Sequence, residues 1–282
     1  MLIKAGFDIE LWASMPTPMT ALLSVHPSRN RDLRTAHRIS VSPDIPAWDY
    51  LDAFGNMATR LTIPAGGARL STEFLVEDSG LPDTPAPIVP VTPVQELPEN
   101  VLPFLLASRY CETERLMQTA WNLFGGILSA RARVEAIVDW VHNHIDFGYH
   151  HARCTRTAWE GYQEQVGVCR DFAHLAVTLC RCVNIPARYC TGYLGDIGVP
   201  AVDAPMDFSA WFEVFVDGGW YTYDARHNHP RIGRILMARG RDATDVAITT
   251  TFGPTSLRRF EVTTMEVNPI AMDNDVRLQQ AA

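Results

Sequence analysis

The sequence predicts an α+β protein, in which an N-terminal antiparallel β-sandwich precedes a core of helices and sheet. Three observations lead to this fold class. Apolar and polar residues alternate with period two near the N-terminus, prolines are dense over residues 81–103, and apolar residues recur at helical spacing beyond them. We therefore expect a β-sandwich domain over residues 1–80, a proline-rich connector over 81–103, an α+β core over 104–267 and a loose tail over 268–282.

The strands expected in the N-terminal domain follow from short apolar patterns. From Ile3 to Ile9 every odd-numbered residue is apolar, and residues 21–25 form a second apolar run. A Gly-Asn pair separates two strand-like flanks within residues 50–61, which predicts a hairpin. Because strand follows strand without helical periodicity, an antiparallel sandwich is expected.

Seven prolines between residues 82 and 103 disfavour a helix or an inner strand, so this stretch is expected to be extended. After it, residues 104–124 and 131–146 carry helical periodicity. A third helix is predicted from Cys169, just after Gly167, and its run of apolar positions ends at Pro186.

The bulk composition is that of a globular protein and narrows the range of partners. Apolar residues make up 47% of the chain and charged residues 20%, and the formal net charge is −8. A negative net charge disfavours nucleic acid, because phosphate binding needs a basic face. The early acidic residues do not fit a signal peptide, and no apolar run approaches the ~18 residues of a membrane span, so a cytoplasmic location without membrane contact is expected.

The distribution of cysteine and histidine favours neither disulfides nor a metal site. All six cysteines lie beyond residue 110, which predicts reduced thiols. His142 and His144 are too close in sequence to share one helix face, and Cys180 and Cys182 point to different sides of a helix for the same reason. We therefore expect no metal, and no organic cofactor is indicated.

Cys169 is the candidate nucleophile because it occupies the first turn of the predicted helix. Exposed backbone N–H groups and the helix dipole favour a thiolate there, so we expect a lowered pKa and a reactive sulfur. The alternative is a buried structural cysteine, which is the more common role of a lone cysteine on a helix. The glycine before it and the charged Arg170-Asp171 pair after it favour the reactive role.

The stretch 167–173 reads Gly-Val-Cys-Arg-Asp-Phe-Ala, and residues 185–189 read Ile-Pro-Ala-Arg-Tyr. With Gly192-Tyr193, they resemble the nucleophile segment of the transglutaminase-like superfamily of cysteine enzymes. The resemblance covers roughly residues 104–255 and is greater to the bacterial transglutaminase-like cysteine proteases than to the calcium-dependent cross-linking enzymes. It implies a papain-like core, preceded by a sandwich domain, with Cys169 as the thiol nucleophile.

The same resemblance exposes a departure from the family pattern. In transglutaminase-like cores a histidine opens a strand in the pattern His-Ala-Trp, and an aspartate lies on the next strand. Here Ser209 stands where the histidine is expected, whereas Asp224 matches the orienting acid. If residues 217–219 close a hairpin, residues whose numbers sum to roughly 436 face each other, which brings His227 across from Ser209. For Asp224 and His227 both to reach the sulfur, the chain must turn after Asp224.

Three explanations of this departure stay open. Another histidine, His227 first, then His229 or His174, serves Cys169 as the base. Alternatively, catalysis is lost and the cleft remains as a binding or scaffold site. In the third case, Ser209 takes part with Asp207 and Cys169 in an altered acyl-transfer chemistry.

Two sets of supporting residues are also expected. The backbone N–H of Cys169, with a second donor from Gln165 or Tyr149, would form an oxyanion hole. Arg188 and Arg226 would pair with Asp171 and Asp224, or else recognise a substrate carboxylate.

The resulting hypothesis is a thiol-dependent amide or peptide hydrolase, or an acyltransferase, that acts through a thioester on Cys169. Its substrate would be a peptide or another amide. The sequence leaves open whether water or an amine receives the acyl group, and it leaves the oligomeric state open.

Overall fold

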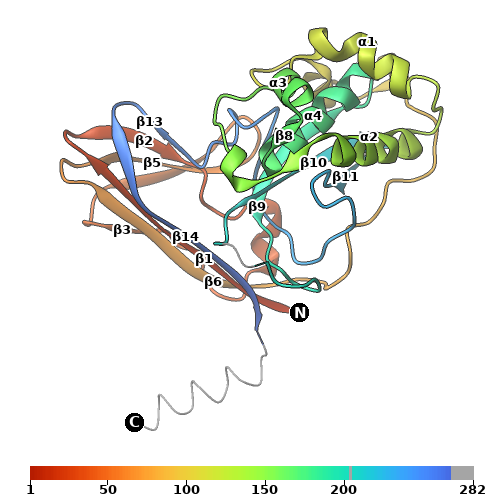
Figure 1. The fold of residues 1–282 in the computed structure, drawn as a ribbon. Coiled ribbons are helices and arrows are strands. Elements are labelled where there is room, and N and C mark those ends of the chain that lie inside the picture. Colours follow the sequence, from red (N-terminus) through yellow and green to blue (C-terminus); the bar gives the residue numbers. More distant parts are fainter. Residues whose placement is uncertain (203–204, 268–282) are drawn as a thin grey trace.

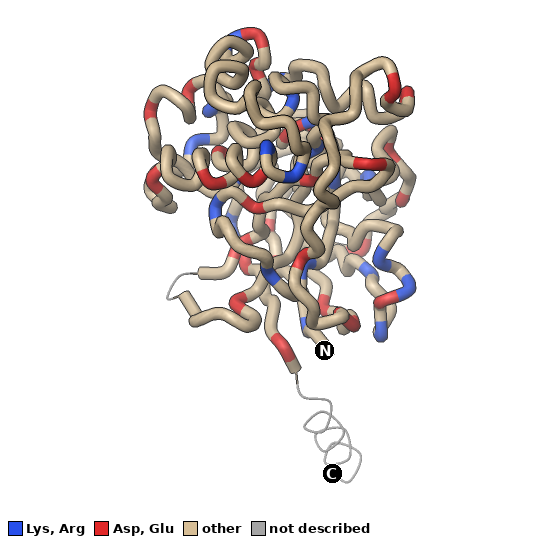
Figure 2. The backbone as a smooth tube through the Cα atoms, turned by 90° about the vertical axis from the view of Figure 1, so that its right-hand side faces the viewer, with Lys and Arg blue, Asp and Glu red and all other residues tan. Residues whose placement is uncertain are grey.

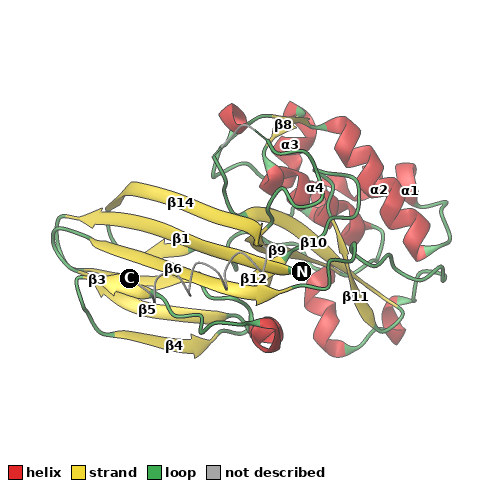
Figure 3. Cartoon of the chain, turned by 90° about the horizontal axis from the view of Figure 1, so that it is seen from below, coloured by secondary structure: helices red, strands yellow, loops and turns green. Residues whose placement is uncertain are grey.

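The computed structural model describes residues 1–202 and 205–267 and has the α+β architecture that the sequence predicts. Two sheets form a β-sandwich, and beside it α-helices cover a separate antiparallel sheet (Figure 1, Figure 3). None of the helices within these two ranges combines the length and the apolar character that a membrane span requires.

Each sheet of the sandwich combines strands from both ends of the chain. One has the order β14-β1-β6-β3, with β1 (Leu2–Ala13), β3 (Ser40–Ser42), β6 (Ala68–Glu77) and β14 (Thr255–Val267). The other has the order β13-β2-β5-β4, with β2 (Thr17–Ala21), β4 (Ala47–Leu51), β5 (Met57–Ile63) and β13 (Thr249–Thr251). All the pairings in these two sheets are antiparallel.

The apolar alternation of the N-terminal residues defines the inner face of the sandwich. Ile3 and Ile9 on β1 are fully buried, and β4 and β5 form the expected hairpin, with Leu51 opposite Met57. The same apolar cluster includes Tyr193, whose ring contacts Phe74 of the sandwich edge-on at a centroid distance of 5.6 Å. The sandwich is therefore packed directly against the second part of the molecule.

Strand β14 belongs to the β-sandwich and not to the α+β core in which it was expected. The sequence assigns residues 255–267 to the α+β core, whereas β14 pairs along β1 from Thr255 opposite Ala13 to Val267 opposite Leu2. A long strand needs a partner for its backbone groups, and the sandwich supplies one. The boundary at residues 81–103 stays a prediction, and the expected tail over 268–282 lies outside the described residues.

The second part of the molecule packs helices on a four-stranded sheet. The helices are α1 (Thr113–Phe124), α2 (Ala130–His144), α3 (Ala158–Glu164) and α4 (Cys169–Cys182). The sheet has the order β11-β10-β9-β12, with β9 (Ala187–Tyr193), β10 (Ser209–Val216), β11 (Gly219–Tyr223) and β12 (Ile235–Gly240). Two short parallel strands, β7 (Asp146–Phe147) and β8 (Val166–Gly167), lead toward α4.

Helix α4 is the central element of this part, because every residue from Asp171 to Cys182 is buried. It contacts α1, α2 and α3 on its helical sides, and β9 and β10 on the sheet side. A helix enclosed in this way has its first residue fixed by the packing of all the others. This is the element that positions the candidate nucleophile.

The helix predicted over 104–124 begins later than expected, at Thr113. Residues Glu99–Leu105 form a 3₁₀ helix that contains Pro103, and proline cannot supply the N–H that an α-helix interior needs. The other 3₁₀ helices of the described chain span Pro27–Asp32, Val94–Glu96 and Tyr149–His151. Over residues 81–103, this leaves a segment without an α-helix or a multi-residue strand.

Charged residues of both signs are interspersed along the chain on the side of the molecule that Figure 2 shows. No extended stretch of one sign dominates this view. Recognition of a charged ligand would therefore depend on a few particular side chains rather than on the field of a whole face.

Candidate active site

The N-terminus of α4 is held by a buried carboxylate. The backbone N–H of Val168 donates to Asp171 Oδ2 over 2.9 Å, and Arg156 Nη1 donates to the same oxygen over 3.0 Å. A Cβ atom on Gly167 would lie 2.7 Å from the Cβ of Asp171, so only glycine allows this close approach. Gly167 and Asp171 together therefore fix the direction in which the Cys169 side chain leaves the helix.

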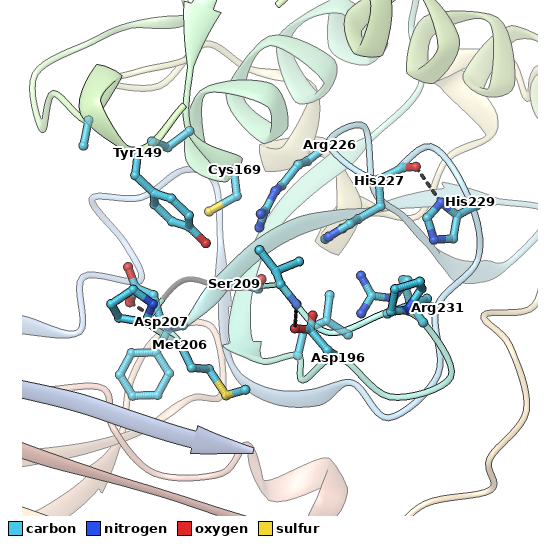
Figure 4. Close-up of a pocket in the computed structure, with 18 residues that line it drawn as sticks. Tyr149, Cys169, Asp196, Met206, Asp207, Ser209, Arg226, His227, His229 and Arg231 are labelled. Carbon is cyan, nitrogen blue, oxygen red and sulfur yellow. Dashed lines mark hydrogen bonds between the residues drawn. The ribbon is translucent and has the colours of Figure 1, made fainter. Parts of the chain in front are cut away.

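A cavity of about 390 Å³ opens in front of this helix end. Its wall includes Cys169, Ser209, Arg226 and His227, which come from α4, from the start of β10 and from the turn after β11. Figure 4 shows the Cys169 and His227 side chains at this cavity, with Arg226 between them in the view drawn. The structure thus brings three of the four predicted site residues, Cys169, Ser209 and His227, from separate segments to one pocket.

His227 of this pocket forms a hydrogen-bonded pair with the buried Asp224 behind it. His227 Nδ1 lies 2.8 Å from Asp224 Oδ2, and the backbone N–H groups of Arg226 and His227 donate to Asp224 Oδ1 over 3.0 and 3.1 Å. With Nδ1 donating its proton to the carboxylate, the ring presents Nε2 as an acceptor. This is the arrangement by which an acid selects the tautomer of a general base.

The turn that makes this pair possible is the one the sequence requires. Strand β11 ends at Tyr223, the N–H of Asn228 donates to the carbonyl of Asp224 over 2.8 Å, and Asn228 has a positive φ of 53°. The hairpin register is close to the predicted one, since Phe212 pairs with Tyr223 and the two numbers sum to 435. Because the chain turns here, the His227 ring reaches the Asp224 carboxylate instead of pointing to the opposite face of a strand.

Asp224 is a carboxylate enclosed by cations. Burial alone would raise its pKa, but Arg234 and His227 hold that pKa far below its ordinary value. Arg234 Nη2 donates to Asp224 Oδ2 over 2.9 Å, and its Nε donates to Asp83 Oδ2 over 2.9 Å. Asp224 therefore stays ionised throughout the neutral range and can neutralise a charged His227.

The pKa expected for Cys169 is wrong in direction. Burial raises the pKa of the Cys169 thiol to about 11, although Arg226 and the backbone N–H of Ala210 act in the opposite direction. The charges of Asp207 and Asp224 act in the same direction as burial, and the sequence argument, which relied on the helix terminus, included neither effect. The sulfur therefore carries its proton at neutral pH, and a base must remove it.

Ser209 begins β10 directly at the pocket and is buried, with its main chain paired opposite Gly192. Its carbonyl accepts a hydrogen bond from Thr191 Oγ1 over 3.0 Å. The position at which the resemblance implies a histidine thus lines the same pocket as the thiol, but a hydroxymethyl group is too short to replace an imidazole.

The other candidate histidines have different surroundings. His174 is fully buried in α4, and its Nε2 accepts the backbone N–H of Ala243 over 3.1 Å. His229 is exposed at the pocket, with Nδ1 2.6 Å from the carbonyl of His227. Of the three histidines considered, only His227 combines a place at the pocket with a carboxylate partner.

Of the two side chains expected to help an oxyanion hole, only Tyr149 lines the pocket. Its side chain is 47% exposed and, in Figure 4, its hydroxyl lies toward the space between Cys169 and Ser209. Gln165 is instead the left-handed residue that ends α3, with φ of 56°, and its carbonyl accepts the N–H of Asp146.

The expected ion pairs of Arg188 and Arg226 are wrong. Arg188 pairs with Glu213 at 2.5 Å, and Arg226 forms no ion pair with any residue in the described ranges. Asp224 is neutralised by Arg234, which sequence reasoning had assigned no role. Only an argument about which cation must balance a buried aspartate would have singled out Arg234 in advance.

Comparison with known proteins agrees with the fold. Residues 118–225 match the model of the transglutaminase-like superfamily. A solved structure from Cytophaga hutchinsonii, named a putative cysteine protease, is 29% identical, with a TM-score of 0.82, and the alignment covers 95% of this chain and 91% of that one. An uncharacterized protein of Mycobacterium leprae is 25% identical over 230 residues, which are 78% of this chain and 81% of that protein. Residues 118–225 therefore form a transglutaminase-like domain, and the chain as a whole is similar in fold to the protein from Cytophaga hutchinsonii.

Proposed function

We propose that this protein cleaves or transfers an amide through a thioester on Cys169, with His227 as the general base and Asp224 as its orienting acid. The observation that carries the proposal is the 2.8 Å contact between His227 Nδ1 and Asp224 Oδ2 at the pocket that also holds the thiol. The likeness to a protein named a putative cysteine protease supports the same chemistry.

The first step is attack of the sulfur on the carbonyl carbon of the amide. Because burial raises the thiol pKa to about 11, the thiolate is not preformed and the proton leaves as the S–C bond forms. Nε2 of His227 receives that proton, and Asp224 stabilises the resulting imidazolium. The negative charge passes to the carbonyl oxygen, which becomes the oxyanion.

The oxyanion needs hydrogen-bond donors that are already in position. The backbone N–H of Cys169 lies in the first turn of α4, where the N–H groups have no partner within the helix. The hydroxyl of Tyr149 is a candidate for the second donor, because this side chain lines the pocket. When the oxyanion collapses, the C–N bond breaks and the amine leaves with the proton from His227.

The thioester is then consumed by a second nucleophile. His227 takes a proton from water or from an amine, which attacks the thioester carbon, and the sulfur leaves as the regenerated thiol. Water yields a carboxylic acid, and an amine yields a new amide. The sequence of bond changes is the same for both, so the acceptor must be found by experiment.

The replacement of histidine by Ser209 is compatible with this chemistry. Asp224, which would orient a histidine at position 209, holds His227 instead. The base would therefore have moved from the strand to the turn that follows the acid, while the nucleophile and the acid kept their places. The participation of Ser209 itself with Asp207 is less supported, because Ser209 has no acidic or basic partner within hydrogen-bond distance among the described residues.

One observation favours the alternative, a binding or scaffold protein with impaired catalysis. Within the described residues, no hydrogen bond connects the Cys169 sulfur to an imidazole, and the thiol pKa is raised. A site of this kind would bind an amide without forming the thioester.

The two possibilities are separated by trapping the acyl-enzyme. The protein is incubated with a panel of quenched fluorescent peptides, with and without an added primary amine, and both the products and the intact protein are analysed by mass spectrometry. The expected result is turnover that disappears in Cys169→Ala and falls by roughly 10²–10⁴-fold in His227→Gln, the range that loss of a general base produces.

Cys154→Ala is the matched control, because Cys154 is an exposed free cysteine outside the pocket. Its activity should equal that of the wild type. If His227→Gln turns substrate over at the wild-type rate, His227 is not the base. If no peptide acylates Cys169 but some bind, the protein is a binding module.

A further inference from the structure

Arg226 has an unusual environment for an arginine that is half-buried. Its guanidinium lies 4.0 Å over the ring of Phe147 and 5.9 Å from that of Tyr149, so the aromatic faces support its flat side. Its five N–H groups have no acceptor within hydrogen-bond distance among the described residues. The side chain is therefore held in place by stacking and presents unused donors to the pocket.

The other arginines near α4 differ in this respect. Arg156 donates to Asp171 and to the carbonyl of His151, and Arg170 donates to the carbonyls of Arg153 and Cys154. Stacking without an acceptor fixes the plane of a guanidinium and leaves its hydrogen-bonding edge for another group. In a site that attacks amides, that group would belong to the substrate.

Side chains of both signs surround the pocket. Asp196 and Asp207 are exposed, and each accepts a backbone N–H, from Val202 at 2.8 Å and from Phe208 at 2.6 Å. Arg226 is half-buried, and Arg231 is only 4% exposed with an Nε that has no acceptor among the described residues. Both arginines line the pocket, whereas the buried carboxylate nearby, Asp224, is already neutralised by Arg234 and His227.

We propose that Arg226 binds a carboxylate of the substrate beside the amide that Cys169 attacks. The inference rests on the proposed function only for the identity of the attacked amide. Arg226 would grip the carboxylate through two parallel N–H···O bonds, the geometry that a guanidinium offers to a planar anion. Arg231 would strengthen the attraction as a second, buried positive charge.

The size of the cavity is consistent with this class of substrate. At about 390 Å³, it is near the lower end of ligand pockets, which run from roughly 300 to 1,000 Å³. A small acidic acyl group or a single acidic residue would fill it. The carboxylate could belong to the acyl part, as in an amide formed on a side chain of glutamate, or to the departing amine, as in a C-terminal residue.

Alkylation of Cys169 tests the site without any turnover. Iodoacetate and iodoacetamide react at the same kind of carbon, but only iodoacetate carries a carboxylate beside it. The rates at Cys169 are measured by peptide mapping, and their ratio is referred to the ratio for a neutral small thiol. Any change in the ionisation of the sulfur affects both reagents equally and cancels in the ratio.

The wild type should favour iodoacetate by roughly tenfold over the reference thiol, the size of one charge-assisted hydrogen bond. Arg226→Gln should remove that preference, and Arg226→Lys should restore part of it because the charge remains without the planar fork. Arg170→Gln is the matched control, since it also removes a positive charge next to Cys169 in the chain. The Arg170 side chain lies outside the pocket and donates to backbone carbonyls. It should keep the wild-type ratio.

A ratio that does not change in Arg226→Gln overturns the carboxylate site, and an equal slowing of both reagents assigns Arg226 to stabilising the thiolate instead. The source of the carboxylate is then distinguished with two pairs of small amides. One pair has a free or amidated C-terminus on the leaving residue, and the other has a free or amidated α-carboxyl on a γ-glutamyl acyl group.

Faster turnover of the acid than of the amide within either pair supports the proposal and identifies the source of the carboxylate. Equal turnover in both pairs, or faster turnover of the amide, contradicts it. The alkylation ratio is independent of catalysis. A protein that keeps the iodoacetate preference but cleaves nothing would therefore refute the proposed function and support the carboxylate site.

Discussion

Replacement of Asp224 by asparagine is expected to destabilise the protein as well as the proposed site. Asp224 is 3% exposed at its side chain, and it balances Arg234, which is 8% exposed, across a contact of 2.9 Å. Asparagine has nearly the same shape but no charge. It would leave Arg234 with Asp83 as its remaining carboxylate, at 2.9 Å.

Loss of one partner from a buried pair costs about 3–5 kcal/mol, because the other charge stays desolvated. Since Asp83 remains, we expect the lower end, about 3 kcal/mol, for Asp224→Asn. At roughly 2–4 °C per kcal/mol for domains of 150–250 residues, this corresponds to about 6–12 °C in the unfolding midpoint. The pair of Lys4 and Glu73 has the same 2.9 Å separation but is exposed, so Glu73→Gln should cost less than about 1 kcal/mol.

The free energy of unfolding is measured by urea titration of the wild type and both variants at several pH values. The folded-state pKa of Asp224 is depressed, so its contribution is present above the unfolded pKa near 3.8 and is lost as the pH falls toward the folded value. Asp224→Asn should therefore lose most stability at neutral pH and approach the wild type in acid. If Asp224→Asn and Glu73→Gln cost the same at pH 7, the argument from burial is wrong.

Three further predictions concern the helix end, the thiol and a buried histidine. Gly167→Ala should lower the free energy of unfolding by about 1–3 kcal/mol, because the added Cβ would lie 2.7 Å from Asp171. Gly126 has open space around it, so Gly126→Ala should change that free energy by no more than about 0.5 kcal/mol in the same urea titration. With a thiol pKa of about 11, the rate of Cys169 alkylation by iodoacetamide should rise about tenfold per pH unit between pH 7 and 10; a plateau below pH 8 would show a preformed thiolate. Burial lowers the pKa of His174 to about 3, so between pH 6.5 and 3 the unfolded chain takes up a proton that the folded chain does not, and the free energy of unfolding should fall as the pH drops. His174→Gln should reduce the slope of this free energy against pH by up to one proton, about 1.4 kcal/mol per pH unit. An unchanged slope would contradict the assignment.

Local signals in the sequence were sufficient for the main elements of the α+β core. The start of α4 at Cys169 follows from a glycine, a carboxylate in the first turn and an apolar run, all of which act over a few residues. The register of β10 and β11 follows from the position of their turn, to within one residue. Such features are fixed by neighbours along the chain, and for that reason they can be read without coordinates.

Contacts between distant segments decided what these elements do. The partner of β14 is β1, although they lie at opposite ends of the sequence, and no local pattern distinguishes one free strand edge from another. Likewise, the pKa of Cys169 depends on how much water the surrounding chain removes from the sulfur. The sequence shows the helix terminus but not the burial that raises this pKa.

The candidate site combines both kinds of information. The sequence alone determined that a thiol at the head of a buried helix is accompanied by an aspartate and lacks the expected histidine at position 209. Only the tertiary structure decided that His227 turns back onto Asp224, that Arg234 balances this carboxylate, and that Arg226 is left with unused donors in the pocket. The reason is physical: charge balance in a buried site is settled among side chains that meet in space, and their separation along the chain does not reveal which of them will meet.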